Sequence, residues 1–426
     1  MNTVKNKRET FNHLQLNSIK RQKFLIFLCC LVYSFAYVGR YSYNANISSI
    51  ILWYGITRAD AGAVSTFFFF SYGAGQLINA ILCKFYSKRY VIAGSLVVSA
   101  IINLILLFLP TFGLIKYLWL INGICQSVLW PTLMLTLGEN LEQGMMKHAV
   151  LAMSLSVVIG TLVAYGGASL FNLFGAFRFS FLLGTVTTVG IGLIWFLSYD
   201  HLVERQIDTV ASKDATVERR NPKATVFSAM VGLLVVCGLF AIVDNLVKDG
   251  LNTWSPVILK EQFGFDDSIS IVLTLVLPIF GVFGSMLAMR TNRVIKDFRN
   301  LIGFFYLLLS GCLCGLFLAL RLNGVILTLV LFGLISCLTH GINSVLTSIM
   351  PLAMRDKMNT GFLAGLMNAT CYIGSTISAY GLGKIADCTS WNFVIQILFV
   401  ASFAAVLLSV GVILVNAIGR IAKKKV

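Results

Sequence analysis

Twelve long apolar runs constrain this chain more than any other feature of its sequence. Each run has about 20 residues or more, the length that an α-helix needs to cross a hydrocarbon core of about 30 Å. None alternates apolar and polar residues as a single strand would, so helices are predicted. The runs cover residues 24–52, 61–83, 90–109, 114–138, 149–173, 179–199, 224–251, 268–289, 300–320, 324–349, 358–383 and 391–417. We therefore expect an all-α membrane protein with twelve transmembrane helices.

The composition excludes an ordinary soluble domain. The chain is 58% hydrophobic and 12% charged, against about 45–50% and 25% in soluble proteins. Its ten cysteines lie mostly inside the apolar runs without CxxC spacing, which favours packing over disulfides or metal ligands. The first twenty residues or so are polar and basic and lack a small-residue cleavage site, which predicts a cytoplasmic tail and an uncleaved first helix.

The basic residues predict how the chain is oriented. If both termini are cytoplasmic, 25 of the 33 Lys and Arg residues lie on the cytoplasmic side. This skew follows the positive-inside rule, so the net charge of +16 requires no nucleic-acid partner. We expect a multi-pass protein of the cell membrane whose loop charges are solvated.

A polar break divides the apolar runs into two groups of six. The segment 200–223 has no apolar period and contains Asn221-Pro222, which indicates a linker. The predicted organisation is a cytoplasmic tail (1–23), a six-helix bundle (24–199), a cytoplasmic linker (200–223), a second six-helix bundle (224–418) and a basic tail (419–426).

The two groups of helices carry traces of an internal duplication. Moving the second half back by 208 residues places Lys248 on Arg40 and Asn252 on Asn44. Transporters use such repeats to build one central site between two halves. The expected architecture is therefore a pair of pseudo-symmetric bundles around a shared cavity.

Arg40 is the strongest candidate for a binding residue. A cation inside a membrane helix costs roughly 2.5 to 3.5 kcal/mol even on the lenient insertion scale. Arg40 lies about 16 residues from the inner end of its run, or about 24 Å, which is too far for its side chain to reach the interface. We predict that it binds an anion in a water-filled cavity; a structural ion pair is the alternative.

Lys248 is the corresponding cation in the seventh run. Asp244 lies four residues earlier, so the two side chains share a helix face and can pair. Lys248 is predicted to bind substrate, and Asp244 to act in coupling or gating by competing with the anion. In the alternative interpretation, Asp244 neutralises Lys248 and the pair locks a gate.

Further polar residues within the runs are substrate-binding candidates. Tyrosine and asparagine side chains can hydrogen-bond a ligand, and a histidine within the membrane can also relay protons. Each of them could instead be a packing residue. The candidates are Tyr33, Tyr37, Tyr41, Asn44, Tyr72, Gln76, Asn252, His340, Asn343 and Tyr372.

Two local features predict helix geometry. Gly160, Ala164 and Ala168 are four residues apart on one side of the fifth run and predict a close-packing seam. Pro131 frees a backbone carbonyl in the fourth run and predicts a bend.

Four motifs resemble those of a known family. They are Tyr33-x3-Tyr37-x2-Arg40, the Tyr72–Gly75 segment YG-x-G, Gly123-x2-Gln126-x3-Trp130-Pro131, and Trp254-Ser255-Pro256 followed by Leu259-Lys260-Glu261. Over nearly its whole length the chain resembles the major facilitator superfamily, and within it the organophosphate:phosphate antiporter branch.

This resemblance implies two six-helix bundles with alternating access and a basic pair that holds phosphate, here Arg40 and Lys248. The chain departs from the branch at several positions. Lys248 replaces an arginine, and so loses the planar fork that suits phosphate. Gln76 and Tyr41 stand where lysines are frequent, and Ser156 stands where a histidine is found. A monoanionic or sugar-like substrate fits these residues as well.

The predicted function is secondary active transport of a small organic anion, with a phosphate ester as one candidate substrate and inorganic phosphate or a proton as the coupling species. The sequence lacks the GxxxxGK[ST] loop and shows no nucleophile with a base partner, so we expect neither ATP use nor an enzyme. No cofactor or metal is expected, and the protein is predicted to be monomeric. Two alternatives stay open: a transporter-like sensor of an external anion, and a proton-coupled exporter.

Overall fold

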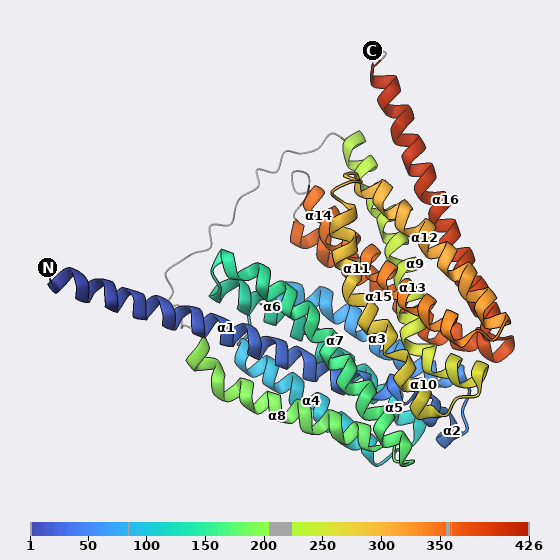
Figure 1. Ribbon diagram of the computed structural model, residues 1–426, viewed down its shortest axis with the longest axis horizontal. Helices are drawn as coiled ribbons and strands as arrows, with labels where there is room; N and C mark the ends of the chain where they lie inside the picture. Colours follow the sequence, from blue (N-terminus) through green and yellow to red (C-terminus); the bar gives the residue numbers. More distant parts are fainter. Residues whose placement is uncertain (1, 84, 204–223, 355–357, 359, 425–426) are drawn as a thin grey trace.

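The computed structural model describes residues 2–83, 85–203, 224–354, 358 and 360–424, and nearly all of them are helical (Figure 1). The first half of the chain contains eight helices. They are α1 (Asn2–Ala45), α2 (Ile47–Tyr54), α3 (Arg58–Leu82), α4 (Lys88–Leu107), α5 (Phe112–Ser127), α6 (Leu129–Asn140), α7 (Gln143–Leu173) and α8 (Phe179–Leu202).

The second half repeats this arrangement. Its elements are α9 (Ala224–Phe263), α10 (Asp267–Thr274), α11 (Val276–Thr291), α12 (Phe298–Arg321), α13 (Val325–Ser344), a π-helix (Val345–Ile349), α14 (Met350–Ala353), α15 (Thr360–Cys388) and α16 (Trp391–Lys424). The two halves form neighbouring bundles in Figure 1, with α3 and α15 between them. Most of the predicted linker, residues 204–223, lies outside the described residues.

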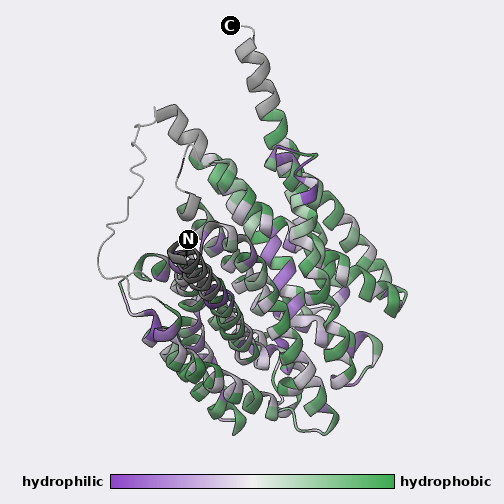
Figure 2. Ribbon diagram, turned by 60° about the vertical axis from the view of Figure 1, so that its left-hand side comes forward, coloured by the Kyte–Doolittle hydropathy of each residue, from purple (hydrophilic) through white to green (hydrophobic). Residues whose placement is uncertain are grey.

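Ten stretches of the described helices are long and apolar enough to cross a membrane. Predominantly hydrophobic helices are visible in Figure 2, with hydrophilic segments at loops and at a few positions within the bundle. The remaining two of the twelve predicted spans correspond to α3 and α15, which are as long but more polar. These two helices pack along each other at the contact between the halves, where side chains meet protein rather than lipid.

The first predicted span differs in detail from the observed helices. α1 extends back to Asn2, so the segment expected to be a solvated tail is helical. The span is then interrupted at Asn46, and α2 follows from Ile47 to Tyr54. The Asn46 side chain donates a hydrogen bond to the Ser42 carbonyl, 2.8 Å away, and thereby satisfies an acceptor at the end of α1.

Prolines account for three other interruptions. The bend predicted near Pro131 is confirmed, because α5 and α6 are separated at Val128. A second break at Leu275 precedes Pro278, and the π-helix at Val345–Ile349 precedes Pro351. A proline cannot donate to the carbonyl four residues earlier, so each helix is reshaped in the turn before its proline.

The predicted small-residue seam is also confirmed. Ala164 and Ala168 are buried, and a Cβ added at Gly160 would lie 2.2 Å from the Ser34 carbonyl oxygen of α1. α7 therefore approaches the backbone of α1 more closely than a larger side chain would allow. The contact involves Ser34 and Tyr37, in the part of α1 that carries the tyrosines and Arg40.

A charged network closes one end of the interface between the halves. We call this the distal end; it is formed by the start of α3 and the ends of α9 and α15. Arg58 donates to Glu261 at 2.8 and 3.1 Å and to Asp387 at 3.1 Å. Asp387 also accepts from the backbone N–H groups of Arg58 and Ala59, and Trp391 donates to Glu261. These three charges, which the sequence predicts to be solvated, are partly exposed and paired with one another.

Candidate functional site

Arg40 lies in an aromatic cage built by α1 and α3. Its guanidinium carbon is 4.6 Å from the ring centre of Tyr72, 4.8 Å from Phe68 and 5.2 Å from Tyr37, with Phe69 and Tyr41 within 5.9 Å. The residue is 6% exposed, and its Nη1 has no hydrogen-bond partner. Ring faces attract a cation but do not accept hydrogen bonds as an oxyanion would.

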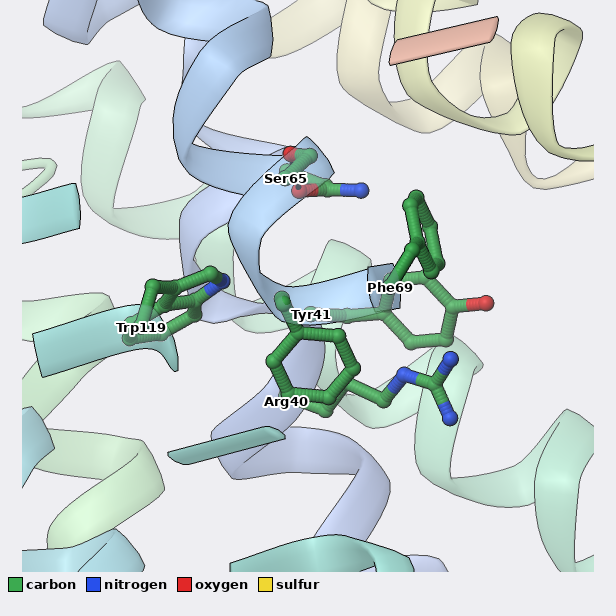
Figure 3. A pocket seen from close by; sticks show the side chains of 7 residues that line it. Arg40, Tyr41, Ser65, Phe69 and Trp119 are labelled. Carbon is green, nitrogen blue, oxygen red and sulfur yellow. Dashed lines mark hydrogen bonds between the residues drawn. The ribbon is translucent and has the colours of Figure 1, made fainter. Parts of the chain in front are cut away.

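Figure 3 shows the Arg40 guanidinium extending toward the side of the pocket occupied by Tyr41 and Phe69, with Trp119 on the opposite side. Among the described residues, Arg40 forms no salt bridge with a carboxylate. A buried cation without a counter-charge is costly, so the geometry favours binding of an anion from outside the chain. The alternative of a structural ion pair finds no support in these contacts.

A chain of polar groups links this cage to the second half. The Tyr72 hydroxyl interacts with the hydroxyls of Tyr33 and Tyr372 and accepts a hydrogen bond from Gln76 at 3.0 Å. Gln76 in turn accepts from Asn368 of α15. Four sequence candidates therefore join in one network between α1, α3 and α15, and the network connects the two halves.

Asn44 connects the Arg40 pocket to α9. Its side-chain oxygen accepts from Ser65 at 2.8 Å, and its amide nitrogen lies 3.4 Å from the Thr253 hydroxyl. Both Asn44 and Ser65 line the same small pocket as Arg40. Asn44 therefore acts as a structural bridge between the halves in this conformation.

Lys248 has different surroundings. It lines a second narrow cavity with Asn252, Ser336 and Thr339 and interacts electrostatically with two carboxylates, Asp249 and Asp244. The predicted hydrogen-bonded pair with Asp244 is not formed, because both Asp244 carboxyl oxygens are buried without a hydrogen-bond partner. The Lys248 side chain is directed instead toward the cavity that α9 shares with α11 and α13.

His340 and Asn343, the two candidates on α13, contact other helices of the second half. His340 packs against Gly281 and Gly284 of α11: a Cβ added at Gly281 would lie 2.8 Å from its ring, and one added at Gly284 would lie 2.7 Å from its Cβ. Its Nδ1 lies 2.8 Å from the Ser336 carbonyl and therefore donates to it, which leaves Nε2 as the acceptor. The Asn343 amide is directed toward the Cys371 sulfur at 3.4 Å, so it contacts α15 rather than either cation.

The cavities contradict one expectation from the sequence. Arg40 and Lys248 were predicted to face a single water-filled pocket, but they line two separate spaces. The Arg40 space holds about one water molecule, and the Lys248 space is too narrow for any. Tyr37 interacts electrostatically with both cations. The closed distal end and tight packing along α3 and α15 account for the separation.

Sequence reasoning missed several residues of the site. Asp249 is nine-tenths buried and accepts a hydrogen bond from Ser375 of α15. Its signal was visible, since a charged residue within an apolar run is a candidate by default. Phe68 and Phe69 carried no such signal, because only the packing of α3 on α1 brings their rings to Arg40.

Comparison with known families classifies the fold. The family model described as Major Facilitator Superfamily matches residues 29–379. The chain belongs to the Major Facilitator Superfamily. This assignment confirms the predicted fold class and makes the chain a multi-pass membrane transporter rather than an enzyme.

Relatives within the superfamily point to one branch. The chain is 22% identical over 400 residues to the membrane sensor protein UhpC of Escherichia coli, covering 89% of each chain. It is 21% identical over 418 residues to a probable hexose phosphate transport protein of Chlamydia pneumoniae, covering 88% of each. These matches confirm, at low identity, the resemblance to the organophosphate:phosphate antiporter branch.

Solved structures of superfamily members share the fold. The nucleoside transporter NupG aligns with a TM-score of 0.68 at 14% identity, covering 93% of this chain and 98% of that one. A D-xylose-proton symporter aligns with a TM-score of 0.69 at 15% identity, covering 92% and 97%. At such identities the likeness concerns the fold alone.

Proposed function

We propose that this protein is a secondary active transporter of a small organic anion, with Arg40 as the principal ligand for the anionic group. The observation that carries this proposal is the unpartnered Nη1 of a buried guanidinium that has five aromatic rings around it. Relatives named as hexose phosphate transport proteins support a phosphate ester as one candidate substrate. Lys248 is the second cation, placed on the matching helix of the other half.

Transport requires the two narrow cavities to merge. With both termini in the cytoplasm, as the distribution of basic residues predicts, the distal end faces outward and is closed in this structure. Breaking the network of Arg58, Glu261 and Asp387 would open that end and separate α3 from α15. The anion would then reach Arg40 beside Tyr37 and Tyr72, while Lys248 approaches from the other half.

Asp244 is the proposed coupling residue. Its carboxylate is 0% exposed and interacts electrostatically with Lys248 without a hydrogen bond. A bound anion and Asp244 compete for the ammonium group of Lys248. Binding of the anion therefore weakens the interaction between Asp244 and Lys248. Inorganic phosphate in exchange, or a proton taken up with the anion, could both use this competition.

Uptake by reconstituted protein tests the proposal. Proteoliposomes loaded with phosphate, or placed in an inward proton gradient, would be offered labelled glucose 6-phosphate, glycerol 3-phosphate and inorganic phosphate. We expect saturable uptake of at least one anion, its loss in Arg40→Ala, and its retention in Arg178→Ala, which removes an exposed arginine of the distal end. Uptake that is unaffected by Arg40→Ala contradicts the proposal.

The second candidate function is that of a membrane sensor. It is supported by the likeness to the membrane sensor protein UhpC over 89% of the chain. A sensor would bind the same anions in an Arg40-dependent way but give no saturable flux in either loading condition. The uptake experiment combined with a binding measurement therefore separates the two functions.

A further inference from the structure

The charges inside the membrane spans do not sum to those of a simple anion site. Arg40 is the cation of the first half, whereas α9 contributes Lys248 together with Asp244 and Asp249. These four formal charges add to zero, and the contribution of the second half alone is negative. A phosphate dianion would bring two further negative charges into a low-dielectric interior. A ligand that also carries a positive group would reduce that cost.

Asp249 lies where such a group could be held. It is 9% exposed, and its carboxylate accepts a hydrogen bond from Ser375, so α9 and α15 fix its position together. Tyr41 and Tyr372 each interact electrostatically with both Asp249 and Arg40. Tyr372 packs on Tyr72 of the Arg40 cage, with 4.9 Å between the ring centres, and Ser375 follows three residues later on α15. α15 therefore leads from the Arg40 cage to Asp249.

Two buried charged residues on the helices that carry Arg40 and Asp249 have unpartnered polar atoms. On the side of the second half, both carboxyl oxygens of Asp244 lack a hydrogen bond although the residue is 0% exposed. On the side of the first half, Nη1 of Arg40 lacks an acceptor. Buried polar groups are ordinarily satisfied, so orphans of opposite sign show that α1 and α9 together have unused capacity to pair with groups of both charges.

We propose that the substrate is a zwitterion whose anionic group, a phosphate or a carboxylate, binds Arg40 and whose ammonium group binds Asp249. This inference rests on the proposed function, since it takes Arg40 as the anion ligand. It adds Asp249 as a residue that determines specificity, with Ser375 as the residue that positions it.

An inorganic cation is a weaker explanation of the carboxylates. The described residues contain no group of three or more His, Cys, Asp or Glu side chains that could hold a metal ion. Lys248 lies beside both carboxylates and would repel a bare cation. An ammonium group joined to an anion is different, because the attraction of the anion for Arg40 and Lys248 offsets that repulsion.

Matched pairs of probes test this inference on purified full-length protein. Glucosamine 6-phosphate and glucose 6-phosphate differ by an ammonium in place of a hydroxyl, and β-alanine and butyrate by an ammonium in place of a methyl. Thermal shift as a function of probe concentration gives the dissociation constant of each. In the wild type we expect the ammonium member of at least one pair to bind at least 10-fold more tightly.

The variants assign the preference to Asp249. Asp249→Asn should weaken binding of the ammonium probe, so that the two dissociation constants within a pair become nearly equal. Asp249→Glu should keep the preference for the ammonium probe. Asp266→Asn is the matched control, because it removes a carboxylate at the start of α10 and asparagine still caps that helix. If Asp249→Asn does not fold, Ser375→Ala takes its place and should reduce that preference.

Several results would overturn the inference. They are equal binding within both pairs, no binding of either ammonium probe, a preference that survives Asp249→Asn, or an effect of that variant only on sodium or proton dependence. In each case anion binding that is lost in Arg40→Ala would still support the proposed function. Anion binding that is indifferent to Arg40 would instead remove the proposed function itself.

Discussion

The two membrane-embedded cations of this transporter differ in what surrounds them. Five aromatic rings lie within 6 Å of the Arg40 guanidinium, and its Nη1 lacks an acceptor. Lys248 lies beside Asp244 and Asp249, which offset its charge. Rings screen a cation from lipid without neutralising it, whereas carboxylates compete with any incoming anion. The pseudo-equivalent positions of the two halves are therefore unequal in chemistry, and Arg40 has the larger capacity to bind an anion.

Removing Arg40 should cause the largest loss of anion affinity. Truncating one partner of a buried charge pair costs about 2 to 5 kcal/mol. We therefore expect Arg40→Ala to weaken binding of the best phosphate ester or carboxylate by at least about 30-fold. The affinity of Arg40→Lys should lie between those of the wild type and Arg40→Ala, because lysine keeps the charge but cannot form the two parallel hydrogen bonds of a guanidinium. Isothermal titration of purified protein measures both, and an unchanged dissociation constant in Arg40→Ala would rule out its assigned role.

Removing Lys248 should have a smaller effect. Its charge is already offset by two carboxylates. The loss of anion-binding free energy should therefore be near the lower value for a hydrogen bond to a charged group, about 1.5 kcal/mol. Lys248→Ala is then expected to weaken anion binding by about 10-fold. The same titration tests this. If Lys248→Ala weakens anion binding more than Arg40→Ala does, Lys248 rather than Arg40 is the principal anion ligand, contrary to the proposal.

Sequence reasoning predicted the first half of the site better than the second. Tyr33, Tyr37 and Tyr41 are spaced by four residues on the helix that carries Arg40, so their common face follows from local geometry. The register of α3 and α15 against α1 depends on side-chain packing between distant segments. Neither Phe68 nor the contact between Gln76 and Asn368 could be derived from spacing.

The helices themselves could be predicted because hydrocarbon requires long apolar runs. The two runs that became the most polar helices, α3 and α15, were still recognisable by length. The closure of the distal end could not be predicted, since Arg58 meets Asp387 from a position 329 residues away. A contact between residues so far apart in the chain leaves no local sequence pattern.

The role of Asp244 sharpens the difference between the halves. Asp244→Asn removes a competitor of the anion for Lys248 and should lower the turnover number about 10-fold. It should change the dissociation constant by less than about threefold, because Asp244 forms no hydrogen bond with Lys248 in this structure. Proteoliposome exchange rates and titration measure the two quantities separately. If both stay at wild-type values, the coupling role is excluded. Asp266→Asn again serves as the control.

The smallest expected effect concerns the distal network. Partly exposed ion pairs contribute about 0.2 to 1 kcal/mol each, and Arg58 forms two. Arg58→Ala should therefore shift the equilibrium toward an open distal end by about fivefold.

Distances between spin labels at Lys116 and Leu322, in a background without accessible native cysteines, report this shift. Arg178→Ala is the matched control because it is exposed at the same end. A distance distribution in Arg58→Ala that equals that of the control would show that the network does not hold this end closed.

The central claim is that Arg40 binds the anionic group of the substrate. Its most direct test is a thermal-shift screen of phosphate esters, carboxylates and neutral sugars with the wild type and Arg40→Ala. The account predicts that at least one anion raises the melting temperature of the wild type in a saturable way and leaves that of Arg40→Ala unchanged. Stabilisation by neutral sugars alone, or equal stabilisation of both proteins by the same anion, would contradict it.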